Sequence, residues 1–495
     1  MHIHRSVFAL GLSWLFAVFS TQAQTLPLAV AQALQQAKIP ANAVSLLVAE
    51  AQGLATPRLT HRTDIPMNPA SVMKLVTTTA ALDLLGPAYV WRTPVWLDGV
   101  VENGVLKGNL VIQGQGDPKL VQERLWLLLR RVQGLGVQRI AGHIVLDNQA
   151  FAVPATNPAD FDGEPLRPYN AAPDALLLNF KALVLTFTPD ARQGVAHVQI
   201  DPPLAGVQLH TQVPLSKSAT CGDYRAGLRA DFSNPSRIRL DGQYPAACGE
   251  KVWPVAYADP TSYNARAIEG LWRSMGGQLD GSVISGVAPA APPSFELASP
   301  TLLEMIRDIN KFSNNVMAQQ VFLTLGLAPP GNGAQPTSPW AVATPDTARL
   351  AVRQWWQRRI SASDVPTLDN GSGLSRTSRI SAAQLGLLLQ KAYAWPIMPE
   401  LMSSLPVVGV DGTLKRSRAS LASAHLKTGS LRDVTALAGY VLGQSGQRYV
   451  LVAMVNHPNA GAARPALDAL IDWVVMDNLP PPTALLPALP GHQTP

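Results

Sequence analysis

Hydrophobic and polar residues follow three successive patterns along the chain. Near the N-terminus, a run rich in Val and Leu over residues 43–50 predicts a short strand. Residues 70–86 then predict a helix, with Pro69 suited to its start and Gly86 to its end. The apolar positions of this helix recur at helical spacing: Val72, Leu75, Val76 and Ala80.

The second pattern extends from about residue 90 to residue 289. Short strand-like runs alternate there with Gly, Pro and Asn, which favour turns. These runs predict one or two β-rich modules. A single helical pattern lies near their end, over residues 260–277.

The third pattern begins at about Ser299, where helical spacing returns. Helical patterns cover residues 299–326, 345–359, 381–395 and 464–479, and the Ser-Asn-Asn at residues 313–315 is expected in a loop between helices. Two strand candidates, Val434–Gly443 and Arg448–Pro458, precede the last helix. No internal repeat is visible, and the proline-rich end of the chain predicts a loosely ordered tail.

The amino-acid composition indicates which class of protein the chain belongs to. The 495 residues are 47% hydrophobic and 15% charged, which is typical of a globular protein with two or three domains. The net charge of +6 suits an anionic environment, but Lys and Arg form no long run. A nucleic-acid binder needs a concentrated basic face, so we expect no nucleic-acid partner.

The N-terminus predicts export. A positive start at residues 1–5 is followed by an apolar run over residues 6–20, too short to span a membrane comfortably. Small residues then suit cleavage after Ala23, so residues 1–23 are expected to be a signal peptide. The alternative is an uncleaved anchor. Either way the protein leaves the cytoplasm, and the membrane contact expected of the mature chain is peripheral at most.

The chain has two cysteines, Cys221 and Cys248. In an exported protein this even pair predicts a disulfide, which would add about 3 kcal/mol of stability by closing its loop. Two free buried thiols are the alternative. A zinc site is poorly supported because there is no Cys-x-x-Cys, and the histidines show no metal-binding spacing.

One pair of residues predicts nucleophilic chemistry. Ser71 and Lys74 form the one Ser-x-x-Lys of the chain. On a helix, positions i and i+3 share a face, so the lysine amine can reach the serine hydroxyl. A lysine can take that proton only if burial or a neighbouring cation lowers its pKa.

Two later motifs complete this chemistry. The Lys427-Thr428-Gly429 stretch beside a strand supplies a cation that could lower the pKa of Lys74, and Thr428 and Ser430 supply hydroxyls for a carboxylate. Gly429 leaves room for substrate to lie against the backbone. Between the motifs, Ser313-Asn314-Asn315 is a Ser-x-Asn: Ser313 could relay a proton, and Asn315 could contact Lys74 and hold the acyl amide. Each tripeptide alone is more often a loop or a helix cap.

In this order, the three motifs resemble the signature of penicillin-recognising serine enzymes. The large separation of Ser71 from Ser313 narrows the resemblance to class C low-molecular-mass penicillin-binding proteins, the D-alanyl-D-alanine carboxypeptidase/endopeptidases of peptidase family S13. Secondary stretches are also similar to this family: GNLVIQGQGDPKL, DNGSGLSR, GVDGTLKR and KTGSLRDVTALAGYV.

The resemblance implies the fold. It is α/β (α+β): a transpeptidase/β-lactamase-like domain, with helices on an antiparallel sheet, that carries a large β-rich insertion of one or two domains. The expected units are the peptidase domain at residues 24–89 and 293–478, an inserted domain at 90–182 and 256–292, a nested domain with both cysteines at 183–255, and a tail at 479–495.

It also implies residue roles. Ser71 attacks the carbonyl of the penultimate D-alanine, Lys74 takes its proton, and the N–H groups of Ser71 and Ser430 form the oxyanion hole. Ser313 and Lys427 pass a proton to the leaving group, whose carboxylate Thr428 and Ser430 hold.

The family pattern further places Arg376 near the substrate. Arg432 departs from the uncharged residue expected at its position, which leaves the side-chain preference open, and insertion acids such as Asp162 could meet a diaminopimelate side chain. The expected partners are peptidoglycan peptides and β-lactams in the periplasm. No cofactor or metal is implied, and the oligomeric state stays open.

Two alternatives remain. A β-lactamase would need a glutamate that activates water, and the chain has no Glu-x-x-Leu-Asn; Glu164 is the nearest candidate and lacks the spacing. A non-catalytic peptidoglycan-binding scaffold would be expected to lack Ser71 or Lys74, and both are present.

Overall fold

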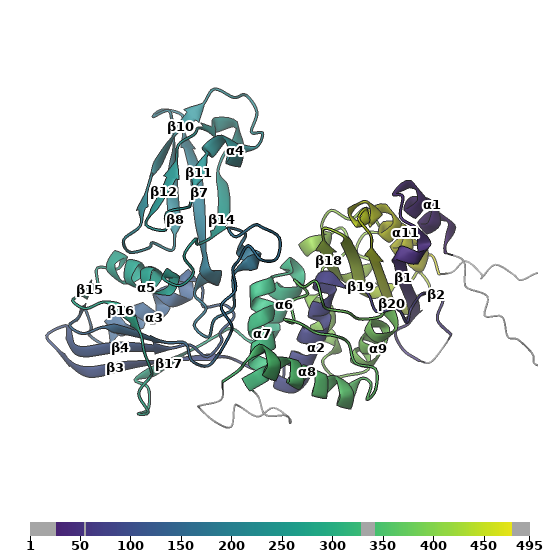
Figure 1. Cartoon of the computed structure of the whole chain (residues 1–495), viewed down its shortest axis with the longest axis horizontal. Helices are drawn as coiled ribbons and strands as arrows, with labels where there is room; N and C mark the ends of the chain where they lie inside the picture. The colour runs from purple at the N-terminus through teal and green to yellow at the C-terminus, as the bar shows by residue number, and fades with distance from the viewer. Residues whose placement is uncertain (1–25, 54–55, 328–341, 478–495) are drawn as a thin grey trace, which may run out of the picture.

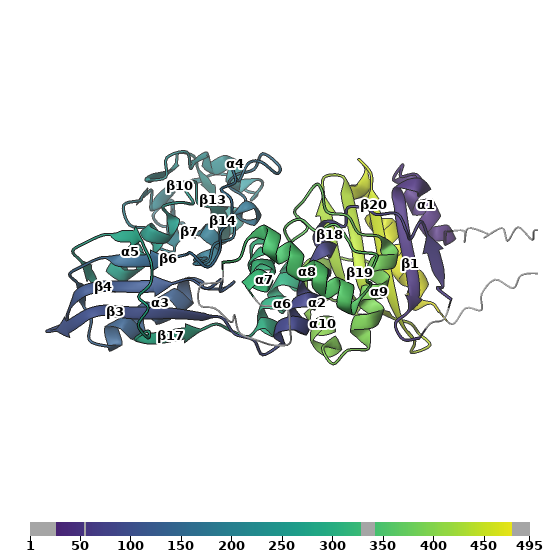
Figure 2. The same cartoon turned by 60° about the horizontal axis from the view of Figure 1, so that its bottom comes forward.

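The computed structural model describes residues 26–53, 56–327 and 342–477 and shows two bodies side by side (Figures 1 and 2). The first contains both ends of the described chain, and the second is formed by its middle (Figure 1). The predicted signal peptide and proline-rich tail lie outside the described residues. Within the described residues, no helix is long and apolar enough to cross a membrane.

The first body is built on a five-stranded antiparallel sheet in the order β18-β19-β20-β1-β2. Its strands are β1 (Val44–Glu50), β2 (Leu59–His61), β18 (Ala424–Leu431), β19 (Val434–Leu442) and β20 (Arg448–Asn456). The expected strands β1, β19 and β20 are present. The Lys-Thr-Gly motif does not merely precede this strand pair, as the sequence suggested, but lies within β18, a further strand at the sheet edge.

Helices cover both faces of this sheet, as Figure 2 shows. On one face lie α1 (Leu28–Gln36) and α11 (Arg464–Val475), which pack together over their own hydrophobic cluster. On the other lie α2 (Lys74–Leu85), α6 (Leu302–Phe312), α7 (Asn315–Leu327), α8 (Pro345–Arg359), α9 (Ala382–Tyr393) and α10 (Met398–Ser404). The mixed fold class predicted from the sequence is confirmed.

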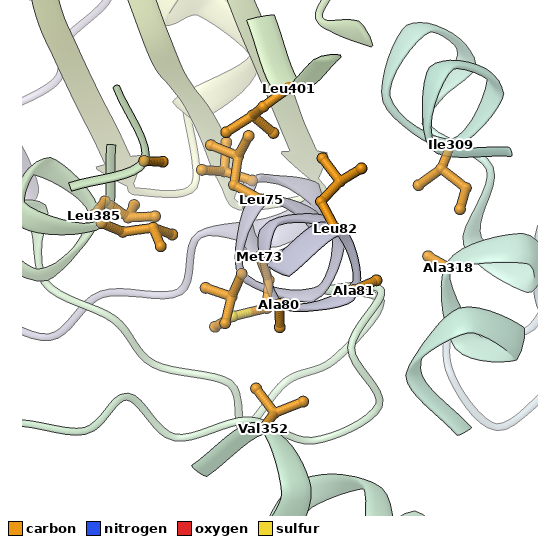
Figure 3. Close-up of a cluster of buried hydrophobic side chains, with 14 of the residues drawn as sticks. Met73, Leu75, Ala80, Ala81, Leu82, Ile309, Ala318, Val352, Leu385 and Leu401 are labelled. Atoms are coloured by element: carbon orange, nitrogen blue, oxygen red, sulfur yellow. The ribbon is translucent and has the colours of Figure 1, made fainter. Parts of the chain in front are cut away.

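Helix α2 lies at the centre of the helices that cover this second face of the sheet (Figure 3). Figure 3 shows Leu75 and Leu82 of this helix among Ile309, Val352 and Leu401 of the surrounding helices. Every residue from Lys74 to Leu82 is buried, so the apolar stripe expected from the sequence underestimates its burial. Two of its three buried threonines have carbonyl partners: Thr77 donates to the oxygen of Gly371, and Thr78 to that of Lys74, whereas the Thr79 hydroxyl has no partner within the described residues.

The second body contains three sheets with one continuous core. The largest is formed by β3 (Arg92–Glu102), β4 (Val105–Gln113), β5 (Arg139–Ile140), β6 (Ile144–Asp147), β15 (Gln278–Leu279), β16 (Val283–Ser285) and β17 (Phe295–Ala298). Helices α3 (Gln122–Gly134) and α5 (Tyr263–Ser274) pack against each other in this body. The sequence predicted α5 but missed α3, because strand-like runs on either side dominated the pattern.

Two smaller sheets stand above the largest one in Figure 1. One has the order β13-β10-β8-β7-β14 and the other β11-β12-β9. Their strands are β7 (Ala182–Asp190), β8 (Val195–Asp201), β9 (Gln208–Leu209), β10 (Gln212–Ser216), β11 (Ala230–Asp231), β12 (Arg237–Leu240), β13 (Tyr244–Pro245) and β14 (Lys251–Ala256). A short helix, α4 (Tyr224–Leu228), lies near the disulfide between Cys221 and Cys248, whose sulfurs are 2.07 Å apart.

The limits of the inserted units stay a prediction. The two smaller sheets occupy residues 182–256, close to the nested unit expected at 183–255. Strand β17 pairs with β3 although it follows residue 292, the expected end of the outer insertion.

Candidate active site

Ser71 lies in a strained turn that leads into α2. The 3₁₀ turn Ala70–Met73 carries it, and Ala70 has φ +48°, a left-handed conformation rare for a residue with a side chain. Asn68 holds the turn, because its Oδ1 accepts from the N–H of Ala70 at 2.9 Å. Asn456 of β20 in turn exchanges two hydrogen bonds with the backbone of Asn68, both 2.9 Å. Such strain persists where surrounding contacts hold it, which is common at functional sites.

Lys74 lies one turn further along and is completely buried. Its Nζ donates to three oxygens: Ser71 Oγ at 2.9 Å, Asn315 Oδ1 at 2.6 Å and the carbonyl oxygen of Ser372 at 2.6 Å. None of these acceptors carries a charge. The amine is therefore aimed at the serine hydroxyl without a carboxylate to keep it protonated.

The pKa of Lys74 is lowered well below its ordinary value. Burial is the main cause, because it penalises the charged ammonium, and the positive charge of Lys427 adds to it. A lowered pKa increases the fraction of the amine that is neutral at a given pH. Lys74 can then accept the proton of Ser71 along the 2.9 Å contact between them.

Ser313 lies in the turn between α6 and α7, with φ +58°. This conformation ends α6 and lets Asn315 begin α7, so that both side chains point into the same site. Lys427 Nζ donates to Ser313 Oγ at 2.9 Å and to the carbonyl oxygen of Thr428 at 2.8 Å. Burial lowers the pKa of Lys427 to about 7, so this amine can gain or lose a proton near neutral pH.

Gly429 has a structural role that the sequence did not indicate. A Cβ at this position would lie 2.4 Å from the carbonyl oxygen of Pro69 and 3.1 Å from the nitrogen of Ser71. The missing side chain thus lets β18 approach the turn that carries the nucleophile, rather than simply making space for substrate. Thr428, next to it, donates its hydroxyl to that of Thr413 at 2.7 Å, and Ser430 is exposed.

Two cavities meet at Ser71 and Ser313. We call the larger one the interbody cavity; it measures about 720 Å³ and lies between the two bodies. The first body contributes Arg376 and Arg432, among others, and the inserted region contributes Phe161, Asp162 and Tyr169. Ser430 lines both cavities, as Ser71 and Ser313 do.

The second cavity, of about 400 Å³, extends from Ser71 past Thr428 into the first body. Its outer wall consists of the 412–417 loop and the start of α11. We call it the cationic cavity because Lys415, Arg416 and Arg464 line it.

Two of the charged groups that line the interbody cavity, Arg376 and Asp162, have partners, whereas the third, Arg432, forms no ion pair or side-chain hydrogen bond within the described residues. Arg376 donates to Asp433 at 3.2 Å, and its guanidinium lies 4.6 Å from the ring centre of Phe161. Asp162 accepts from the Tyr169 hydroxyl and from the amide of Asn170, both at 2.8 Å, and these bonds hold its pKa below the usual value against the opposing effect of burial. Glu164 pairs instead with Arg167 and is absent from the residues that line either cavity.

Sequence reasoning missed two contributors. The carbonyl of Ser372 binds Lys74, and the hydroxyl of Thr413 binds Thr428. Both lie in stretches that resemble the family, DNGSGLSR and GVDGTLKR, so the resemblance marked the segments without revealing a role. No group of three or more His, Cys, Asp or Glu suited to a metal ion occurs within the described ranges.

Comparisons with known proteins identify the family of the chain. The family model described as the D-Ala-D-Ala carboxypeptidase 3 (S13) family matches residues 26–475. D-alanyl-D-alanine carboxypeptidase DacB of Haemophilus influenzae is 25% identical over 407 residues, which cover 79% of this chain and 81% of that protein. A D-alanyl-D-alanine carboxypeptidase of Actinomadura sp. (strain R39) is 27% identical over 425 residues, covering 80% and 74%.

The fold has a solved counterpart. The crystal structure of penicillin binding protein 4 (dacB) from Haemophilus influenzae matches with a TM-score of 0.67 and 21% identity, over 89% of this chain and 99% of that one. The same protein complexed with a novel β-lactam matches with a TM-score of 0.65 and 22% identity, over 90% and 100%. At this identity the likeness concerns the fold.

Proposed function

The chain belongs to the D-Ala-D-Ala carboxypeptidase 3 (S13) family and is a serine-type peptidase of the carboxypeptidase/endopeptidase class, and from this premise we propose that Ser71 is its acylated nucleophile. The family predicted from the motif set is thereby confirmed. The observation that carries the proposal is the 2.9 Å contact of Lys74 Nζ with Ser71 Oγ, because Lys74 is buried and all three of its hydrogen-bond acceptors are uncharged.

The reaction begins with proton transfer from Ser71 to neutral Lys74. Ser71 Oγ attacks the carbonyl carbon of the penultimate D-alanine, and the N–H groups of Ser71 and Ser430 stabilise the oxyanion. Asn315, which holds Lys74 at 2.6 Å, also binds the amide of the acyl group.

Collapse of the intermediate requires a proton on the departing amine. The pair of Lys427 and Ser313 delivers it, which their 2.9 Å hydrogen bond and the lowered pKa of Lys427 support. Thr428 and Ser430 hold the carboxylate of the leaving D-alanine. Water then cleaves the acyl-enzyme: the proton held by Lys74 returns to Ser71 Oγ, and the proton lost by the water replaces the one that Lys427 and Ser313 gave to the leaving amine.

The substrate spans both cavities. The stem peptide that becomes the acyl group occupies the interbody cavity, where Arg376 and Asp162 face a chain with both carboxylate and amine groups. The leaving group occupies the side of Thr428. A β-lactam acylates Ser71 in the same way and is released slowly, because its ring-opened leaving group stays attached. The site of action is the periplasm, since the substrate lies outside the cytoplasm and residues 1–23 resemble a signal peptide.

Intact-protein mass spectrometry with benzylpenicillin tests the nucleophile. We expect one stable adduct on the wild-type protein, none on Ser71→Ala, and an undiminished adduct on Ser218→Ala, an exposed serine of the insertion. Hydrolysis of a peptide ending in D-Ala-D-Ala should disappear with the adduct. Rapid turnover of penicillin without an adduct would favour a β-lactamase, and a folded protein with neither adduct nor turnover would favour the scaffold.

A further inference from the structure

The cationic cavity has three positive side chains that no other part of the described structure neutralises. Lys415, Arg416 and Arg464 are exposed and lie on its wall. Within residues 26–53, 56–327 and 342–477, none of them forms an ion pair or a side-chain hydrogen bond. The single acid of this lining, Asp468, already accepts from the Ser417 hydroxyl at 2.7 Å and from the backbone of Arg418.

The loop that presents Lys415 and Arg416 is held at both ends, and Arg464 lies at the start of α11. Buried Lys311 of α6 pairs with Asp411 at 2.6 Å, and Asp411 also accepts from the N–H of Val407 at 2.8 Å. Gly412 passes so close to α6 that a Cβ would lie 2.6 Å from the carbonyl oxygen of Lys311. At the other end, the bond from Ser417 to Asp468 fastens the loop to α11. The backbone that carries Lys415 and Arg416 is thus fixed in place beside α11, which lowers the entropic cost of binding an anion.

The position of the cavity indicates which part of a substrate would enter it. It begins at Ser71 and Ser313 and passes Thr428, on the leaving-group side of the proposed reaction. Its volume of about 400 Å³ lies within the range of roughly 300–1,000 Å³ for ligand pockets. A single departing D-alanine would fill only a small part of it.

We propose that the cationic cavity binds the acceptor stem peptide of a peptidoglycan cross-link through that peptide's carboxylates. In a cross-link, the group leaving the D-alanyl carbonyl is the side-chain amine of a diamino acid, which belongs to a second stem peptide. That peptide carries several carboxylates, whereas the leaving D-alanine of an uncross-linked peptide carries one. Lys415, Arg416 and Arg464 thereby favour cleavage of cross-links over removal of terminal D-alanine. The inference rests on the proposed function and adds substrate preference to it.

The expected effect is moderate because the three groups are exposed. Exposed charge pairs are individually weak and screened by salt, but three that act on one ligand add up, and complementary charge also speeds association. The preference for cross-linked substrate should therefore weaken as salt concentration rises.

The experiment measures kcat/KM for two substrates: a stem pentapeptide and a cross-linked dimer of stem peptides. We expect the dimer-to-pentapeptide ratio to fall about tenfold in the triple variant Lys415→Gln, Arg416→Gln, Arg464→Gln. A matched triple variant removes three exposed charges outside both cavities, Arg353→Gln, Arg358→Gln and Arg418→Gln, and should keep the wild-type ratio.

A dimer whose acceptor carboxylates are amidated completes the test. The wild-type protein should discriminate against it, and the cavity triple variant should treat both dimers alike. An unchanged ratio in the cavity variant, or equal discrimination against the amidated dimer in both proteins, would overturn the inference. Failure of the proposed function would look different, because the wild-type protein would then cleave neither substrate and form no penicillin adduct at Ser71.

Discussion

The two cavities that meet at Ser71 differ in how their charges are used. In the interbody cavity, Arg376 pairs with Asp433 and Asp162 is held by Tyr169 and Asn170, so that two of its three charged side chains have partners and only Arg432 has none among the described residues. In the cationic cavity, positive groups face solvent without a partner among the described residues. The first cavity requires both bodies of the protein, and the second is built from the first body alone.

This difference separates two kinds of recognition around one nucleophile. Engaged charges hold the shape of a wall, so the interbody cavity suits selection of a particular stem peptide. Free charges attract any acidic group that fits, so the cationic cavity suits a variable leaving group. The chemistry itself lies between them, in groups that both sides share.

The largest effect is expected at that shared centre. Lys74→Ala should lower kcat/KM by about 10³-fold for the pentapeptide and for the cross-linked dimer alike, because it removes the proton acceptor of Ser71. Steady-state kinetics on both substrates measures this. Lys74→Arg should be equally inactive, since arginine stays protonated in proteins. A loss confined to one substrate would contradict a common centre.

The next effect concerns pH. The charge of Lys427 lowers the pKa of Lys74, so Lys427→Gln raises the pKa of Lys74. Lys74 is active only when neutral, and the acidic limb of the penicillin acylation rate should therefore move to higher pH. The measurement is the second-order rate constant of acylation as a function of pH. The midpoint of the acidic limb is read separately from the plateau, so a lower maximal rate does not affect it. A limb that stays in place or moves to lower pH would exclude this coupling.

A smaller effect is expected in the interbody cavity. Arg376→Ala releases Asp433 and uncovers the ring of Phe161, and we expect KM to rise about fivefold for both substrates, as for loss of one modest polar contact. The dimer-to-pentapeptide ratio should stay unchanged, because both substrates place the same acyl group there. Arg167→Ala, whose partner Glu164 lines neither cavity, is the control. A changed ratio would mean that the two cavities are not independent.

The smallest effect on the reaction is expected from the disulfide. Replacing Cys221 and Cys248 by serine should lower the free energy of unfolding by about 3 kcal/mol, because a long loop is no longer closed. Penicillin acylation should change less than twofold, since neither cysteine lines a cavity at Ser71. Thermal unfolding and acylation are measured on the same sample. A large loss of acylation in folded protein would show that the two smaller sheets of the second body support the wall of the interbody cavity.

Local pattern predicted much of the first body. Helix spacing placed Lys74 one turn after Ser71, and turn and cap residues bounded most helices to within a few positions. Alternating runs predicted that the middle of the chain is rich in strands. The misses included helices α1, α3 and α10, the extra strand β18 and the complete burial of α2, where flanking or tertiary context overrode the pattern.

By itself, the sequence determined the order of the three motifs and hence the family and the identity of the chemical groups, because these depend on residue type and short spacing. Only the tertiary structure decided that the carbonyl of Ser372 holds Lys74 and that Thr413 supports Thr428. It also decided that Arg376 and Asp162 on one side of Ser71 have partners, whereas the three cations of the cationic cavity have none among the described residues. The physical reason is that periodicity determines which face a side chain occupies on its own element. The path of distant loops then decides which partners it meets: Ser372 lies 298 positions from Lys74 along the chain.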